Sequence, residues 1–219
     1  MLPDLSRLCV ALVGAGADAE GTAPRSSKRA RGSVSYVETE EAEESPLVST
    51  IVLPEKLPGA LKIANVCFVD KPARVRRSEV GLLVVVTDTP GYDARSGKYG
   101  GARVAFHPFR DLAAEPDTVV VAAIGAAVAS VREHWSARPG TSVLVHCNAG
   151  QNRSAAVVLA VLLSYGVPSV EALRLVEATR TADAAGPGAA WDRDGWEKFV
   201  GPNGERLRQL VLATFASDQ

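Results

Sequence analysis

Residues 143–154 read VLVHCNAGQNRS, and they give the clearest indication of the fold class. Residues 143–146 form a short apolar run, which predicts a buried strand. Residues 155–163, which follow the stretch, are apolar at every position and predict a helix buried in the centre of the domain. The loop between them contains Gly150, and a strand that passes through such a loop into a buried helix is typical of an α/β domain.

The loop of this stretch has the chemistry of an anion-binding site. A loop that leads into a helix N-terminus turns backbone N–H groups inward, and the helix dipole adds positive potential that favours phosphate. The same field would stabilise a thiolate at Cys147. Arg153 can offer a planar fork of donors to two phosphate oxygens, and Gly150 lets the backbone approach the phosphate closely.

The sequence HCNAGQNRS (residues 146–154) resembles the signature loop of the protein tyrosine and dual-specificity phosphatases. In that loop a Cys and an Arg are separated by five residues, with His before the Cys and Ser or Thr after the Arg. The resemblance implies that Cys147 attacks phosphorus to form a phosphocysteine, that Arg153 binds the phosphate, and that Ser154 helps the thiolate to leave. It implies hydrolysis without a metal or cofactor, and a phosphate-binding loop made of His146, Asn148, Ala149, Gly150, Gln151 and Asn152.

The same family uses an aspartate, upstream of the cysteine, to protonate the leaving oxygen and then to activate water. Asp111 fits this role, because residues 104–110 before it resemble the short strand and turn that precede the acid in dual-specificity phosphatases. Asp117 is the competing candidate. It stands directly before a predicted helix at residues 119–131, where Asp117 or Thr118 is suited to be the N-cap. We therefore predict that Asp111 is the acid and that His146 orients the loop.

The rest of the chain alternates strand-like and helix-like segments. Strands are predicted at residues 63–69, 82–86 and 103–106, and further helices at 169–178 and around 207–215. We expect an α/β fold like that of the phosphotyrosine phosphatases, with a central twisted mixed sheet flanked by helices on both faces. Two more elements extend the resemblance over about residues 50–215: an opening strand at 61–65, and a closing element formed by Pro202, Asn203, Leu207, Gln209 and Leu210.

Composition divides the chain into a tail and one domain. Residues 14–45 consist mainly of Gly, Ala, Ser and charged residues, so we predict a disordered tail at 1–46 and a catalytic domain at 47–219. Within the domain, residues 181–201 are predicted to form a loop that carries Trp191 and Trp196.

Charge and cysteine content limit the partners and the compartment. The 24 basic and 25 acidic residues nearly cancel, so bulk charge favours neither nucleic acid nor an acidic membrane. Three cysteines without a CxxC pair favour a reducing compartment, and no apolar run reaches the roughly 18 to 20 residues that span a bilayer. Residues 8–13 resemble a short signal-peptide core, but Asp4 precedes them, and we predict an intracellular protein without a membrane segment.

Three functions are compatible with these residues. The first is dephosphorylation of phosphotyrosine and of phosphoserine or phosphothreonine in proteins. The second is an RNA 5′-triphosphatase or phosphatase, because an Asn-Arg pair such as Asn152-Arg153 also occurs in those relatives, although they generally lack the acid. The third is a pseudophosphatase that only binds phosphoproteins. The loop has no lysine, which disfavours phosphoinositides, and only 5% of residues are aromatic, which disfavours RNA stacking, so we predict a phosphoprotein substrate.

Overall fold

The computed structural model describes residues 48–51, 53, 55–88, 99–112, 114–178, 198–199 and 201–216. The chain divides into two units, residues 1–42 and 43–219, and every described residue belongs to the second. The predicted tail at 1–46 therefore lies outside the described residues. So do Cys9, Trp191, Trp196 and most of the predicted loop at 181–201.

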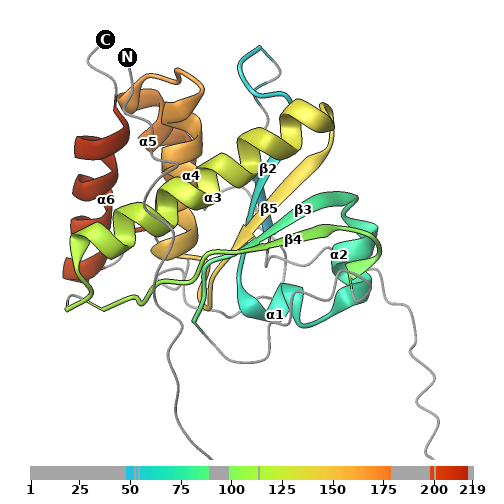
Figure 1. The fold of residues 1–219 in the computed structure, drawn as a ribbon, viewed down its shortest axis with the longest axis horizontal. Coiled ribbons are helices and arrows are strands. Elements are labelled where there is room, and N and C mark those ends of the chain that lie inside the picture. The colour runs from blue at the N-terminus through green and yellow to red at the C-terminus, as the bar shows by residue number, and fades with distance from the viewer. Residues whose placement is uncertain are drawn as a thin grey trace, which may run out of the picture. The chain divides into compact units, whose positions relative to one another are not determined.

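The described strands form one mixed sheet with the order β1-β2-β5-β3-β4 (Figure 1). They are β1 Val48–Ile51, β2 Leu61–Ala64, β3 Val80–Val85, β4 Arg103–Phe106 and β5 Ser142–His146. Only the β1–β2 pair is antiparallel among the described strands, and all other pairs are parallel. Because β5 is the middle strand, the loop that follows it lies at the centre of the carboxyl edge, where open α/β sheets bind ligands.

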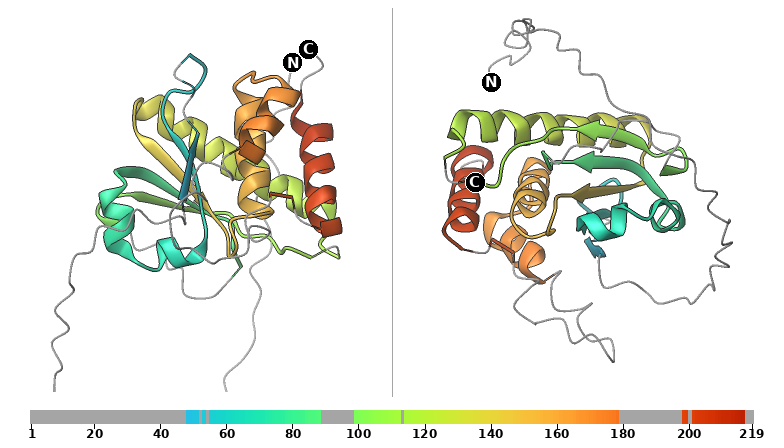
Figure 2. Two further views of the ribbon diagram at one scale, coloured as in Figure 1. Left: turned by 180° about the vertical axis from the view of Figure 1, so that it is seen from behind. Right: turned by 90° about the horizontal axis from the view of Figure 1, so that it is seen from below.

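The described helices cover both faces of this sheet (Figure 2). The smaller layer contains α1 Val66–Val69 and α2 Pro72–Arg77, and the larger layer contains α3 Asp117–Ala137, α4 Arg153–Ser164, α5 Ser169–Ala178 and α6 Gly201–Phe215. Side chains alternate along β5, so that Val143 and Val145 join the core under the larger layer while Leu144 joins the core under the smaller one. The predicted mixed sheet with helices on both faces is confirmed.

Helix α4 occupies the centre of the larger layer. It contacts α3, α5 and α6 as well as β2 and β5, and residues 153–163 are all buried. A helix surrounded in this way needs apolar side chains on every face, which confirms the prediction drawn from residues 155–163. At its end, Gly166 has a φ of +74°, and the N–H of Val167 donates to the carbonyl of Leu162 at 3.1 Å.

Two predictions about element boundaries were wrong. The strand predicted at 63–69 ends at Ala64, because the side chain of Asn65 accepts the N–H of Phe68 at 3.1 Å and starts α1, so Cys67 lies in a helix. The predicted N-cap of α3 is also corrected: Asp117 is the first helical residue after Pro116 and makes no cap hydrogen bond. Its carboxylate instead forms an ion pair with Arg206. Strand β1 and helix α2 were not predicted.

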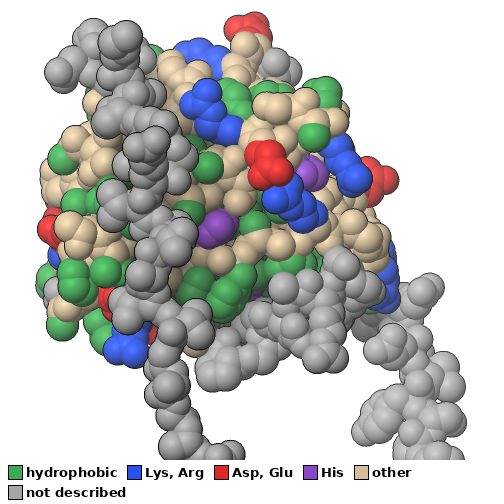
Figure 3. Space-filling model, in the orientation of Figure 1, with side chains coloured by type: hydrophobic (Ala, Val, Ile, Leu, Met, Phe, Trp, Pro, Cys, Tyr) green, Lys and Arg blue, Asp and Glu red, His purple; other side chains and the backbone are tan. Residues whose placement is uncertain are grey.

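Surface charge agrees with the balanced composition. Figure 3 shows Lys and Arg side chains interspersed with Asp and Glu on the face that α3 crosses. None of the helices in the described ranges is long and apolar enough to cross a membrane.

Candidate active site

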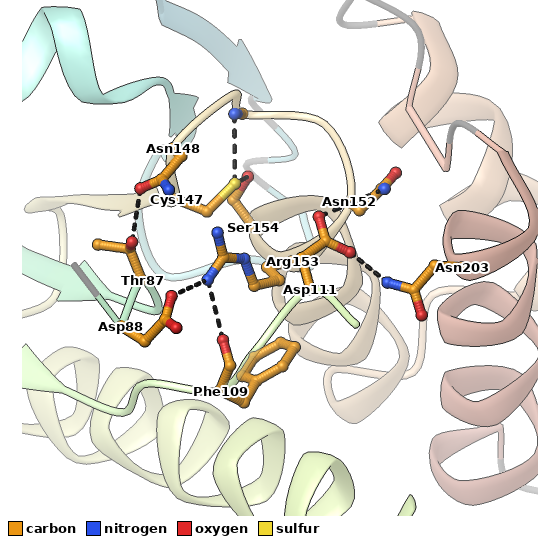
Figure 4. A network of polar contacts seen from close by, with 11 residues as sticks. Thr87, Asp88, Phe109, Asp111, Cys147, Asn148, Asn152, Arg153, Ser154 and Asn203 are labelled. Atoms are coloured by element: carbon orange, nitrogen blue, oxygen red, sulfur yellow. Dashed lines mark hydrogen bonds and ion pairs between the residues drawn. The ribbon is translucent and has the colours of Figure 1, made fainter. Parts of the chain in front are cut away.

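Cys147 is the first residue after β5 and lies at the base of the β5–α4 loop (residues 147–152). Its side chain is 1% exposed. The N–H of Gly150 donates to Sγ of Cys147 at 3.2 Å, and Oγ of Ser154 lies 3.3 Å from the same sulfur (Figure 4). The sulfur thus accepts a hydrogen bond from the loop backbone and contacts the hydroxyl of the first turn of α4.

The β5–α4 loop is held at its first half by the two strands beside β5. The N–H of Val66, just after β2, donates to the carbonyl of Asn148 at 3.0 Å. Oγ1 of Thr87, just after β3, donates to Oδ1 of Asn148 at 2.5 Å. Gly150 has a φ of +73°, and a Cβ there would lie 3.1 Å from the carbonyl oxygen of Ala64, so both backbone conformation and packing require glycine.

A segment far along the chain holds the second half of the loop. Nζ of Lys198 donates to the carbonyl of Gly150 at 2.6 Å, and the N–H of Phe199 donates to the carbonyl of Gln151 at 3.4 Å. Lys198 is 9% exposed, so its ammonium brings a largely buried positive charge to the loop. Because outside donors occupy these two carbonyls, the loop can keep its N–H groups for an anion.

Arg153 is the first residue of α4 and is nearly buried, with 5% exposed. One terminal nitrogen donates to Oδ1 of Asp88 and to the carbonyl of Phe109, both at 2.9 Å. Nε is buried and has no hydrogen-bond partner among the described residues. The guanidinium is therefore fixed on one side and retains an unused donor. The hydrogen bond from Arg153 also lowers the pKa of Asp88.

Asp111 lies opposite the cysteine, in the loop between β4 and α3 (Figure 4). Nδ2 of Asn152, the last residue of the β5–α4 loop, donates to Oδ2 of Asp111 at 3.4 Å. Nδ2 of Asn203, on α6, donates to the other carboxylate oxygen. Asp117, the competing candidate, makes its hydrogen bonds with Arg206. A hydrogen bond therefore connects Asp111, and not Asp117, to the β5–α4 loop.

The family model for the dual specificity phosphatase catalytic domain matches residues 98–188. That range contains both the β5–α4 loop and Asp111. Over these residues the chain is similar to the dual-specificity phosphatases. It is also 31% identical over 134 residues to the mouse (Mus musculus) dual specificity protein phosphatase 12, in an alignment that covers 61% of this chain and 38% of the mouse protein. The chain thus spans little more than a third of the length of that family member.

Solved structures agree on the fold. The crystal structure of human DUSP28 superposes with a TM-score of 0.54 at 22% sequence identity, covering 79% of this chain and 97% of that one. A single-residue variant of human DUSP28 gives a TM-score of 0.53 at 21% identity, covering 76% and 94%. These similarities confirm the phosphatase-like fold that the sequence predicts.

In the candidate site, His146 is the last residue of β5 and is fully buried. Burial lowers its pKa to about 4, so the imidazole is neutral at neutral pH. A neutral buried ring suits the predicted orienting role, since it brings no charge to the loop. No group of three or more His, Cys, Asp and Glu residues in the described ranges could hold a metal ion.

Sequence reasoning missed three residues that contact the site. Asp88 follows β3 at the start of a segment rich in turn residues, and no spacing relates it to Arg153. Lys198 lies near the end of the predicted loop at 181–201, where one lysine indicates only a solvated surface. Arg206 looks like an ordinary exposed helix residue. Asn203 was noticed as part of the closing element, but its contact with Asp111 was not predicted.

Proposed function

We propose that this chain is a cysteine-dependent protein phosphatase that hydrolyses phosphotyrosine and phosphoserine or phosphothreonine monoesters through a phosphocysteine intermediate. One observation carries the proposal. The sulfur of Cys147 accepts a loop N–H and contacts a hydroxyl at the base of an anion-binding loop, while the last residue of that loop donates to the Asp111 carboxylate. A nucleophile and a proton donor thus face the same space.

In the first step, the Cys147 thiolate attacks phosphorus while the bond from phosphorus to the ester oxygen breaks. Protonated Asp111 gives its proton to that leaving oxygen. The loop N–H groups and Arg153 bind the phosphate oxygens, and Nε of Arg153 supports this role because it is a buried donor without a partner among the described residues.

In the second step, the Asp111 carboxylate accepts a proton from water as the water oxygen attacks the phosphocysteine. The phosphorus–sulfur bond breaks, and Cys147 leaves as a thiolate. The hydroxyl of Ser154, 3.3 Å from the sulfur, can donate a hydrogen bond to the departing thiolate and so lower the barrier of this step. Inorganic phosphate is then released.

The contacts favour a phosphoprotein over the two alternatives. Asn152, the residue that suggested an RNA 5′-triphosphatase, donates to Asp111, so the acid accounts for its presence. A pseudophosphatase that only binds phosphate would need the loop but neither the thiol nor the acid. We further propose an intracellular location, because a nucleophilic thiol must stay reduced.

The test is hydrolysis of para-nitrophenyl phosphate in excess EDTA, followed from about pH 5 to 8. Wild-type protein should be active, Cys147→Ser inactive, and Asp111→Ala changed in its pH profile. Competition between a phosphopeptide and a 5′-triphosphorylated RNA then separates the protein substrate from the RNA. A folded wild-type protein that releases no nitrophenol would overturn the proposal.

A further inference from the structure

Arg206, on helix α6, binds the loop that carries Asp111. This loop, here called the acid loop, comprises residues 107–112 and 114–116. Nη1 of Arg206 donates to the carbonyl of Leu112 at 3.2 Å, and Nη2 donates to the carbonyl of Glu115. Nε donates to the carboxylate of Asp117 at 3.0 Å. One guanidinium thus holds the acid loop at two carbonyls and also binds the first residue of α3, which follows the loop.

Arg206 is also linked to Asp111 through Asn203, one turn earlier on α6. Nη1 of Arg206 donates to Oδ1 of Asn203 at 3.3 Å, and Nδ2 of Asn203 donates to Oδ1 of Asp111. An arginine can only donate, so it determines which end of the amide faces it, and the NH₂ group must then face the carboxylate. Arg206 therefore orients the amide that contacts the acid.

The residue just before α6 also contacts the β5–α4 loop. Phe199, just before the helix, donates its N–H to Gln151, and its backbone is so close to Gly204 that a Cβ there would lie 2.2 Å from it. Phe199, which packs against the first turn of α6, thus contacts the β5–α4 loop, while Asn203 and Arg206 of α6 contact the residues around Asp111. These contacts can together set the distance between the two loops.

Stability alone is a weak explanation for this network. Leu207 and Val211 already anchor α6 in the core. The side chains of Arg206 and Asp117 are 25% and 60% exposed, and exposed ion pairs contribute little to folding. A better explanation is that the network holds the catalytic acid in place, since a small displacement of a catalytic group changes reaction rates strongly.

We propose that Arg206 and Asn203 are positioning residues that hold Asp111 at the distance from the β5–α4 loop required for proton transfer. The inference rests on the proposed function, in which Asp111 is the acid. It requires that loss of Arg206 weakens the proton transfer and leaves nucleophilic attack by Cys147 intact.

Two substrates separate proton transfer from attack. Phenyl phosphate releases a phenol like that of tyrosine, with a pKa of about 10, which needs a proton to leave, whereas para-nitrophenolate leaves without one. For Arg206→Met we expect kcat on phenyl phosphate to fall about tenfold while kcat on para-nitrophenyl phosphate changes by less than about twofold. Asn203→Ala should show the same pattern and provides a second variant if Arg206→Met does not fold.

Arg208→Met is the matched control. Arg208 lies on the same helix, and its guanidinium binds Glu205 of that helix, away from the acid loop. We expect both substrates to be hydrolysed at the wild-type rate, within about twofold, because the loss is an exposed ion pair.

A double-mutant cycle gives the deciding result. If Arg206 acts through Asp111, adding Arg206→Met to Asp111→Asn causes no further loss on phenyl phosphate. A further tenfold loss, or an equal loss on both substrates in the single variant, would overturn the inference and leave the proposed function standing. A wild-type protein inactive on both substrates would overturn the proposed function, and the inference with it.

Discussion

The two sides of the candidate site are built in different ways. The nucleophile side consists of Cys147, the β5–α4 loop and Ser154, all within one strand–loop–helix passage. The acid side is assembled from distant segments, since Asp111 meets Asn152 across 41 positions and Asn203 across 92. We infer that the nucleophile side is determined by local sequence, while the acid side depends on how α6 and the β4–α3 segment pack.

The sharpest test of this comparison sets Cys147→Ser beside Asp111→Asn. The first should abolish turnover of every substrate, a loss of more than about 10³-fold, because no other group can attack phosphorus. The second should cost about 10²-fold or more on phenyl phosphate and far less on para-nitrophenyl phosphate. Steady-state kinetics on both substrates decides, with circular dichroism to check folding. Equal losses on both substrates for Asp111→Asn would remove Asp111 from the acid role.

Two glycines separate backbone strain from site geometry. Gly150 and Gly166 have almost the same φ, +73° and +74°, but only at Gly150 would a Cβ meet other atoms, at 3.1 Å from Ala64. Each change to alanine should destabilise the fold by about 1 to 2 kcal/mol. Only Gly150→Ala should also lower kcat/KM, by about tenfold or more, because its loop must shift. Thermal unfolding and kinetics measured together check this, and comparable loss of activity in Gly166→Ala would contradict it.

Lys198→Met tests whether the nucleophile side is as self-contained as the comparison suggests. The ammonium of Lys198 holds the Gly150 carbonyl from outside the loop. Its loss should weaken phosphate binding and raise the inhibition constant for inorganic phosphate by about three- to tenfold, because a buried charge-assisted hydrogen bond is lost. Lys71→Met, at the exposed residue just before α2, is the control. Unchanged inhibition would show that the local stretch alone forms the anion site.

A further test concerns the pH dependence of stability. His146 has a folded-state pKa of about 4, below its ordinary value of 6.5, because burial disfavours the imidazolium. The unfolded chain therefore takes up the proton first, and stability should fall as the pH is lowered from 6.5 to about 4, by at most about 3 kcal/mol. His146→Asn should flatten this part of the curve of unfolding free energy against pH. An unchanged slope would assign the dependence to other groups.

The strand and the helix on either side of the cysteine could be predicted because their signals are local. Residues 143–145 and 155–163 are apolar throughout, and the structure buries them on both faces of the sheet and on all faces of α4. The strand predicted at 63–69 was too long, because apolar content alone does not separate a strand from a short helix. Asn65, a good N-cap, was the available signal.

The sequence indicated the fold class, and the position of Cys147 and Arg153 at the start of a helix indicated an anion site. The roles of Cys147 as nucleophile and of Ser154 came from the family resemblance, as did the role of Asp111. The groups that surround these residues became visible in the folded chain: they are Asp88, Lys198, Asn203 and Arg206. The physical reason is that a hydrogen bond or ion pair acts over a few ångströms in space, and a side chain's separation along the chain does not reveal that distance.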